Sequence, residues 1–215
     1  MKKKVPSNFK IYEHAVIPKI IHYCWFGFGP IPDSHKRWME SWHKFCPDYE
    51  IKEWNENNYD ISKNVYMKQA YENKKWGFVP DYARLDIIYQ YGGIYLDTDV
   101  ELITNIDDLL YQDGFIGFES EEWINFGMGF GAVQGLEIIR ELRDDYRERK
   151  LLKEDGSLNL MTSPKIQTGF LQKRGLRANG EYQIIEGLTV YPEKVLGGKS
   201  PITRKVDILP YTKAI

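Results

Sequence analysis

The stretch Tyr89–Leu102, YQYGGIYLDTDVEL, joins an apolar run to three acidic residues at alternate positions, Asp97, Asp99 and Glu101. The apolar residues that follow the paired glycines predict a buried strand. Because side chains alternate along a strand, Asp97 and Asp99 are expected on one face, about 6.5–7 Å apart. They would emerge at the C-terminal end of the strand, where open α/β sheets bind ligands.

The segments around this stretch predict an α/β fold. A helix is expected over 80–91, opening on Pro80 and closing at the two glycines. Upstream, residues 16–25 and 48–55 have the pattern of strands and 32–45 that of a helix, which together make a βαβ unit. The remaining predicted elements are a helix at 62–76, strands at 114–119 and 123–133, and a helix at 135–152.

Composition limits the possible partners. The chain has 215 residues, 42% hydrophobic and 28% charged, which suits one domain spanning 1–215. Its net charge of -2 offers no broad basic surface, so nucleic acid is not expected as a partner.

The sequence also bears on location. The basic start lacks the apolar region of a signal peptide, and no apolar run reaches the roughly 20 residues of a membrane helix. Cys24 and Cys46 fit no zinc or disulfide framework and predict free thiols. We therefore expect a cytoplasmic protein, with at most peripheral contact at the inner face of the cell membrane.

Two carboxylates at one strand end would repel each other without a cation. Hard oxygen ligands favour Mg²⁺ or Mn²⁺, and such sites borrow substrate phosphates as further ligands. The alternative for Asp97 and Asp99 is a solvated acidic turn. The predicted helix before them adds Asp81 and Arg84, which lie on one helical face and would bring a fixed cation near the acids. Their alternative role is an ordinary surface ion pair, worth under about 1 kcal/mol.

Three segments occur in an order that resembles a known family: IPKIIHYCWFG, FVPDYARLDIIYQYGGIYLDTDVEL and WINFGMGFGAVQG. Between residues 17 and 135 the chain resembles the D-x-D sugar transferases typified by yeast initiating α-mannosyltransferases and bacterial capsular-polysaccharide transferases. The catalytic domains of the clostridial glucosylating toxins are similar. The resemblance implies a GT-A fold, with a Rossmann-like mixed sheet covered by helices.

The resemblance also implies roles around the nucleotide sugar. Trp25 would stack on the base, for which an indole offers a wide π-face; its alternative role is a core tryptophan. Asn55, after the second strand, would contact the nucleotide. Asp81 would hold sugar hydroxyls, and Arg84 would reach the sugar and the diphosphate.

Four further roles come from the same family motif. Tyr95 would lie beside the donor, Asp97 would bind the ribose or the sugar, and Asp99 would bind Mn²⁺ or Mg²⁺ with Asp97 as a second ligand. Asn125 aligns with a polar position of the donor site.

The activity implied is metal-dependent transfer of a hexose from a UDP- or GDP-sugar to a carbohydrate or glycolipid acceptor, in capsular polysaccharide or glycolipid synthesis. Anomeric configuration would be retained, and since the motif positions no nucleophile, front-face attack by the acceptor hydroxyl is favoured. The family continues beyond the region of Tyr191 and Pro192 to a segment with His and Trp. Because this chain stops at LPYTKAI, the sequence predicts a domain truncated at its C-terminal end.

Three other functions make different demands on the sequence. A haloacid-dehalogenase-type phosphohydrolase also uses D-x-D, but its later acidic pair should follow a strand, whereas Asp144 and Asp145 fall in a predicted helix. A calcium loop would require glycine where Leu102 stands. A catalytically silent nucleotide-sugar or carbohydrate-binding protein of the same fold remains an open alternative.

Overall fold

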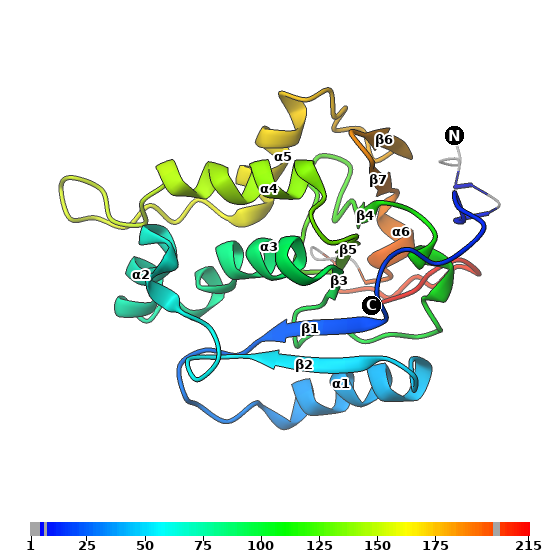
Figure 1. The fold of residues 1–215 in the computed structure, drawn as a ribbon, viewed down its shortest axis with the longest axis horizontal. Coiled ribbons are helices and arrows are strands. Elements are labelled where there is room, and N and C mark those ends of the chain that lie inside the picture. Colours follow the sequence, from blue (N-terminus) through cyan, green and yellow to red (C-terminus); the bar gives the residue numbers. More distant parts are fainter. Residues whose placement is uncertain (1–4, 7, 200–202) are drawn as a thin grey trace.

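Strand β1 (Ile20–Cys24) leads through helix α1 (Asp33–Phe45) to strand β2 (Glu50–Trp54), and the two strands pair in parallel. The predicted βαβ unit is thereby confirmed. The structure is a computed structural model that describes residues 5–6, 8–199 and 203–215. Its strands form one mixed sheet in the order β2-β1-β3-β5-β4-β7-β6 (Figure 1).

The other strands complete the sheet on the far side of β1. They are β3 (Gly93–Tyr95), β4 (Gly114–Gly117), β5 (Phe130–Ala132), β6 (Gln183–Ile185) and β7 (Leu188–Tyr191). Strand β3 is parallel to β1, and β4 is parallel to β7, while the remaining pairs are antiparallel. The carboxyl ends of β1, β2 and β3 therefore meet at one edge.

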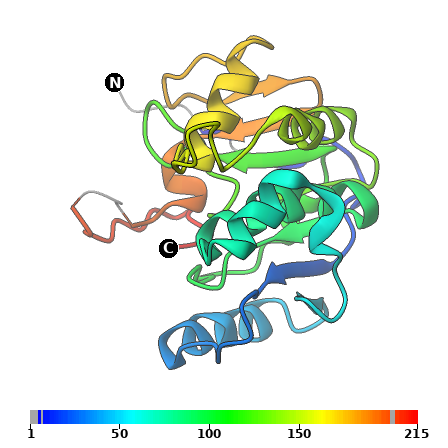
Figure 2. The same cartoon turned by 90° about the vertical axis from the view of Figure 1, so that its left-hand side faces the viewer.

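Helices cover both faces because neighbouring strand residues point into two different cores. Cys24 and Tyr95 belong to one hydrophobic cluster, and Tyr23 and Ile94 belong to the other. The first cluster is covered by α2 (Val65–Glu72), α3 (Pro80–Tyr91), α4 (Glu137–Asp145) and α5 (Ser163–Gln172). The second is covered by α1 and the short α6 (Glu193–Leu196), and Figure 2 shows α1 apart from the helices above it.

Two predicted helices are shorter than expected. The segment 62–76 divides into the 3-10 turn η1 (Ile61–Lys63), helix α2 and the start of the 3-10 turn η2 (Trp76–Phe78). Asn64 separates the first two, since its side chain accepts a hydrogen bond from Met67 N at 3.0 Å and caps α2. Further 3-10 turns are η3 (Asp107–Leu110) and η4 (Tyr146–Glu148), the latter ending the predicted helix at 135–152.

The prediction that Asp97 and Asp99 lie on a strand is wrong. Strand β3 ends at Tyr95, and only Leu96 N still bonds the neighbouring strand, at His22 O. The next amide, Asp97 N, donates instead to Gly127 O at 3.0 Å, and Val100 N closes a turn on Asp97 O at 3.1 Å. The acids therefore sit in a turn just beyond the strand, still at the carboxyl edge of the sheet.

The C-terminal residues pack beside this turn. Glu101 and Ile215 exchange backbone hydrogen bonds of 3.0 and 2.9 Å, and Ile103 N donates to Lys213 O at 3.0 Å. This antiparallel pairing centres on Leu102 and Ala214. One wall of the acidic turn is thus supplied by the end of the described chain.

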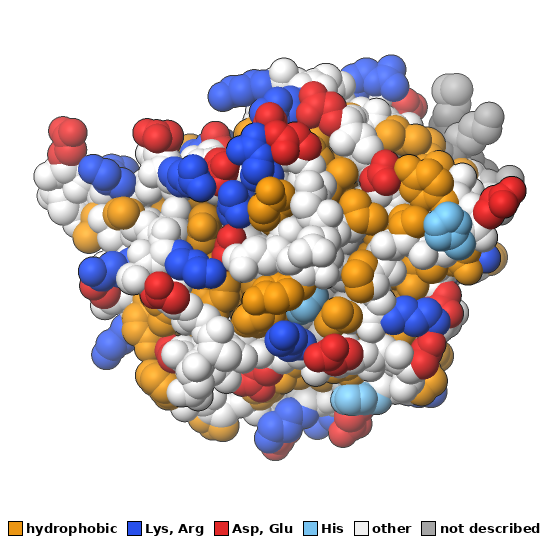
Figure 3. Space-filling view, in the orientation of Figure 1, with side chains coloured by type: hydrophobic (Ala, Val, Ile, Leu, Met, Phe, Trp, Pro, Cys, Tyr) orange, Lys and Arg blue, Asp and Glu red, His pale blue; other side chains and the backbone are white. Residues whose placement is uncertain are grey.

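Charges on the surface are mixed. On the face seen in Figure 3, basic and acidic side chains gather together over the region of α4. There Arg140 lies 3.0 Å from Asp144, which also accepts from Arg143 at 2.8 Å. In the described part of the chain, no helix is long and apolar enough to cross a bilayer, and both cysteines are buried free thiols.

Candidate active site

Helix α3 places a buried ion pair directly beside the acidic turn. Arg84 Nη2 lies 3.2 Å from Asp81 Oδ1, one helical turn away, and Arg84 Nη1 lies 3.6 Å from Asp97 Oδ2. The Asp81 and Arg84 side chains are only 3% and 4% exposed, so the alternative of an ordinary surface pair is wrong. As expected, the pair lies next to the acidic residues of the turn.

Burial changes the proton affinities of this pair. Desolvation raises the pKa of Asp81 to about 6, although the Arg84 charge and a 3.1 Å hydrogen bond from Tyr66 favour its ionised form. Desolvation also disfavours the charged form of Arg84, but the nearby carboxylates outweigh it and the net pKa is raised. Arg84 is therefore a permanent cation, and it lies over the Tyr95 ring with 5.2 Å between Cζ and the centroid.

The carboxylate of Asp97 is fixed from three sides. Its Oδ1 accepts a 2.9 Å hydrogen bond from the Tyr95 hydroxyl, and Arg84 faces its Oδ2. Desolvation raises the pKa of Asp97, opposed by Arg84 and assisted by the charge of Asp99. On the third side lies Gly127, where any Cβ would overlap Asp97 Oδ2. The side chain is still 34% exposed, so a ligand can reach it.

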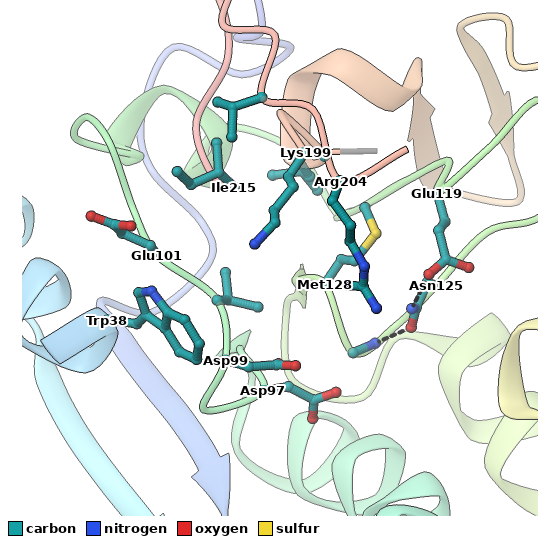
Figure 4. A pocket seen from close by; sticks show the side chains of 15 residues that line it. Trp38, Asp97, Asp99, Glu101, Glu119, Asn125, Met128, Lys199, Arg204 and Ile215 are labelled. Carbon is teal, nitrogen blue, oxygen red and sulfur yellow. Dashed lines mark hydrogen bonds between the residues drawn. The ribbon is translucent and has the colours of Figure 1, made fainter. Parts of the chain in front are cut away.

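Two cavities of about 310 Å³ each meet at Asp97 and Asp99, which line both. We call them the Trp25 cavity and the Trp38 cavity. The walls of the first include Trp25, His35, Trp76, Pro80, Arg84 and Thr98. Those of the second include Trp38, Glu119, Asn125, Met128, Lys199 and Arg204 (Figure 4).

The Trp25 cavity has aromatic walls. Trp25 directly follows β1, is half-buried, and is fixed by a 2.6 Å hydrogen bond from Nε1 to Gly29 O. It therefore faces a cavity while also packing at the edge of the core. Trp76 is 41% exposed and lies against Gly27, where a Cβ would stand 3.1 Å from the indole ring.

Two expected donor residues stand away from the cavities. Asn55 lines neither one; its Nδ2 donates to Glu53 and its Oδ1 accepts from Asn57 N, which holds the turn after β2. Tyr95 is fully buried and reaches the site only through its hydroxyl on Asp97. This arrangement does not favour direct contact of the Asn55 or Tyr95 side chain with a nucleotide sugar.

Asn125 lies in the Trp38 cavity, apart from Trp25. Its Oδ1 accepts from Gly127 N at 2.7 Å and its Nδ2 donates to Glu119 at 3.1 Å. Asn125 thereby fixes the backbone that presses on Asp97. Glu101 also lines this cavity, but Figure 4 shows its carboxylate directed away from Asp97 and Asp99.

Sequence reasoning missed several residues that line the site: Trp38, Trp76, Gly127, Lys199 and Arg204. Trp38 falls in the predicted helix at 32–45, where helical spacing indicates packing and not a cavity wall. Lys199 and Arg204 lie in an irregular segment without periodicity, so no local signal marks them. Gly127 falls in a predicted strand, where only its contact with Asp97 reveals the need for glycine.

The donor set fits a hard divalent ion in part. Asp99 and Asp97 offer carboxylate oxygens at one point, as Mg²⁺ or Mn²⁺ prefers. Among the residues that the structure describes, however, no group of three His, Cys, Asp or Glu side chains could hold a metal ion. The remaining ligands would have to come from substrate phosphates and water.

Known proteins of similar sequence are glycosyltransferases. Residues 32–116 match the family described as "Glycosyltransferase sugar-binding region containing DXD motif". Inositol phosphoceramide mannosyltransferase 3 of Schizosaccharomyces pombe is 32% identical over 144 residues, which cover 63% of this chain and 40% of that protein. Inositol phosphoceramide mannosyltransferase 2 of the same yeast is 32% identical over 120 residues, covering 50% and 32%.

The alignments thus span two fifths or less of each curated relative. Among solved structures, the PaToxG glycosyltransferase superposes with a TM-score of 0.57 at 18% identity, covering 75% of this chain and 71% of that one. At that identity the likeness concerns the fold, which is of the expected GT-A type.

Proposed function

Because residues 32–116 match the sugar-binding region of the DXD glycosyltransferases, we propose that the chain transfers a hexose from a nucleotide-diphosphate sugar to a carbohydrate or glycolipid acceptor. The observation that carries the proposal is the pair of contacts that Arg84 makes with Asp81 and Asp97. Asp81 is buried, whereas Asp97 lies with Asp99 where the two cavities meet. A fixed cation between ordered carboxylates suits a reaction that separates a cationic sugar from an anionic diphosphate.

The donor is proposed to lie with its base in the Trp25 cavity. Trp25 offers its ring there, and a base can stack on an indole whatever its hydrogen-bonding edge. UDP and GDP sugars are therefore both candidates. Asp97, aligned by Tyr95 and Arg84, would accept hydrogen bonds from the ribose or the sugar hydroxyls.

Each side chain has a separate task at the reacting bond. The Arg84 guanidinium is close enough to the turn to favour negative charge on the leaving diphosphate. The carboxylates of Asp81 and Asp97 favour positive charge on the sugar ring. A Mg²⁺ or Mn²⁺ ion held by Asp99 and Asp97 would stabilise the diphosphate further when bound. With no protein nucleophile proposed, the acceptor hydroxyl would attack on the face that the diphosphate leaves, retaining configuration.

The acceptor is proposed to enter through the Trp38 cavity, which the donor base leaves free. The two curated relatives are named as mannosyltransferases for inositol phosphoceramide, which supports a hexose donor and a glycolipid acceptor here. A carbohydrate acceptor, as in capsular polysaccharide assembly, is the other candidate. Either setting would suit a protein that touches the inner face of a cell membrane only peripherally.

The test is donor binding and hydrolysis across a panel of UDP- and GDP-sugars, with Mn²⁺ and with EDTA. Asp99→Asn should remove the part of binding that depends on Mn²⁺ and lower hydrolysis at least tenfold, while the melting temperature stays within a few degrees. Glu101→Gln is the matched control, because that carboxylate points away from the acid pair. If the wild-type protein binds no nucleotide sugar with Mn²⁺, the proposal is wrong.

Binding without turnover would have a different meaning. A protein that binds one nucleotide sugar tightly, yet neither hydrolyses it nor transfers the sugar to any glycan or lipid extract, would be a binding protein of the same fold. Release of inorganic phosphate from phosphate monoesters, abolished by Asp97→Asn, would support the phosphohydrolase alternative instead.

A further inference from the structure

Two cations reach into the Trp38 cavity from the C-terminal part of the chain. Lys199 and Arg204 both line this cavity, and Figure 4 shows their side chains extending toward the side where Asp97 and Asp99 lie. Backbone contacts are present next to both cations: Lys199 pairs with Val206, and Asp207 N donates to Gly198 O at 2.7 Å. Within the described residues, neither cation has an ion-pair partner.

The charges at the site show what these cations could do. Asp81, Asp97 and Asp99 carry three negative charges, and Arg84 supplies one positive charge among them. A divalent ion would balance the two charges that remain. A diphosphate would then add two negative charges. Among the described residues that line the two cavities, Lys199 and Arg204 are the Lys and Arg side chains other than Arg84, and they could offset those charges.

We infer that Lys199 and Arg204 bind the diphosphate of the donor directly, so that diphosphate recognition persists without a divalent metal. The inference rests on the proposed function, since it assumes that the donor is a nucleotide-diphosphate sugar. Arginine and lysine are the side chains that hold phosphate oxygens best, the first through its planar fork and the second as a point charge. Neither residue belongs to the D-x-D segment.

The size of the cavities agrees with this position. Each cavity, at about 310 Å³, is near the lower limit of roughly 300–1,000 Å³ for small-molecule sites, so a nucleotide sugar in the Trp25 cavity would extend to the junction and leave the rest of the Trp38 cavity to the acceptor. With the base at Trp25, the diphosphate falls at the junction formed by Asp97 and Asp99. That junction is the part of the Trp38 cavity toward which Lys199 and Arg204 extend.

The test compares nucleoside diphosphates with the matching monophosphates, UDP with UMP and GDP with GMP. Dissociation constants are measured by calorimetry on the whole chain, in Mn²⁺ and in EDTA. In EDTA, the wild-type protein should still prefer the diphosphate by about tenfold or more, the range of charge-assisted contacts. The double variant Lys199→Ala/Arg204→Ala should lose that preference and leave monophosphate affinity unchanged.

Lys205→Ala is the matched control, because Lys205 is an exposed cation of the same segment that lines neither cavity. Circular dichroism and a thermal melt verify that each variant is folded. The inference is overturned if wild-type protein in EDTA binds diphosphate and monophosphate equally, or if the double variant keeps the preference. Either result, combined with nucleotide-sugar binding in Mn²⁺, leaves the proposed function standing; loss of that binding in the wild type would remove both.

Discussion

Gly127 lies directly against the carboxylate of Asp97, so closely that a Cβ at this position would overlap Oδ2 and come within 2.8 Å of Arg84 Nη1. Both neighbours are held by other contacts, Asp97 by Tyr95 and Arg84 by Asp81. Neither can move without losing a hydrogen bond or an ion pair. The glycine is therefore part of what aligns the Asp97 carboxylate.

Replacing this glycine should impair donor binding. We expect Gly127→Ala to weaken affinity for the best nucleotide sugar by at least tenfold, since the methyl group must displace Asp97 or Arg84. The measurement is calorimetric titration with the donor. Gly169→Ala is the control, because nothing lies within 4 Å of the added Cβ in helix α5 and alanine favours a helix. Equal donor affinity in both variants would contradict the role given to Gly127.

The buried pair Asp81–Arg84 should be costly to break from one side. Arg84→Met leaves the Asp81 carboxylate buried without its cation, and we expect a loss of about 3–5 kcal/mol in the free energy of unfolding. The double variant Asp81→Asn/Arg84→Met keeps an acceptor for the Tyr66 hydroxyl and removes the lone charge. Urea denaturation should show the double variant to be more stable than Arg84→Met. A lower free energy of unfolding in the double variant would contradict the view that Arg84 stabilises the protein by pairing with the Asp81 charge.

Stability should fall as pH is lowered through the range of one buried histidine. Burial lowers the pKa of His22 from 6.5 to about 4, although Gly92 O, which lies 3.0 Å from Nε2, favours the protonated ring. Trp54 Nε1 donates to Nδ1 at 3.1 Å, a contact that requires an unprotonated nitrogen and therefore favours the neutral ring. As the pH falls below 6.5, His22 binds a proton in the unfolded chain, whereas in the folded chain it stays neutral down to about pH 4. The stabilisation from neutral His22 is complete above pH 6.5 and is lost toward pH 4, about 3 kcal/mol in all.

Urea titrations at several pH values between 7.5 and 4.5 test this. His22→Gln, which cannot titrate, should show a shallower fall in unfolding free energy across that range than the wild-type protein. His43→Gln, an exposed histidine of α1, should follow the wild-type curve. A His22→Gln curve parallel to the wild type would remove His22 as the cause.

Trp25 should contribute to nucleotide affinity through its ring. Base stacking on an aromatic side chain is worth about 1–3 kcal/mol, so Trp25→Ala should raise the dissociation constant of the nucleotide about 5- to 150-fold. Trp25→Phe should recover a large part of the loss, because a smaller π-face remains. Trp123→Ala serves as control, since Trp123 is 36% exposed and lines neither cavity. A phenylalanine variant as weak as the alanine one would point to the Nε1 bond with Gly29 instead.

The local features of the fold were predictable from sequence. Alternating apolar segments bounded by Pro80 and the glycines at 92 and 93 identified α3, β3 and the unit from β1 to β2, because these depend on periodicity and turn chemistry. The resemblance found in the same segments led to Asp81, Arg84, Asp97 and Asp99, which do lie together.

What sequence could not supply are contacts between distant segments. The alternation at Asp97 looked like a continuing strand, and only the bond from its amide to Gly127 O turns the chain away. Asn55 follows β2 as expected, yet its side chain serves its own turn. Lys199 and Arg204 line the cavity in a part of the chain that is joined to the acidic turn through Ala214, which pairs with Leu102 and accepts a hydrogen bond from Gly198 N. No local sequence pattern predicts this pairing.

That last pairing sets an order of events during synthesis. The acidic turn leaves the ribosome long before residues 213–215, which close its open side, so a nascent chain carries the carboxylates without the cations that extend over them. Contacts of such wide sequence separation form late in folding. Newly made chains should therefore gain their full affinity for a donor only after residues 213–215 have emerged and paired with the segment that follows the acidic turn.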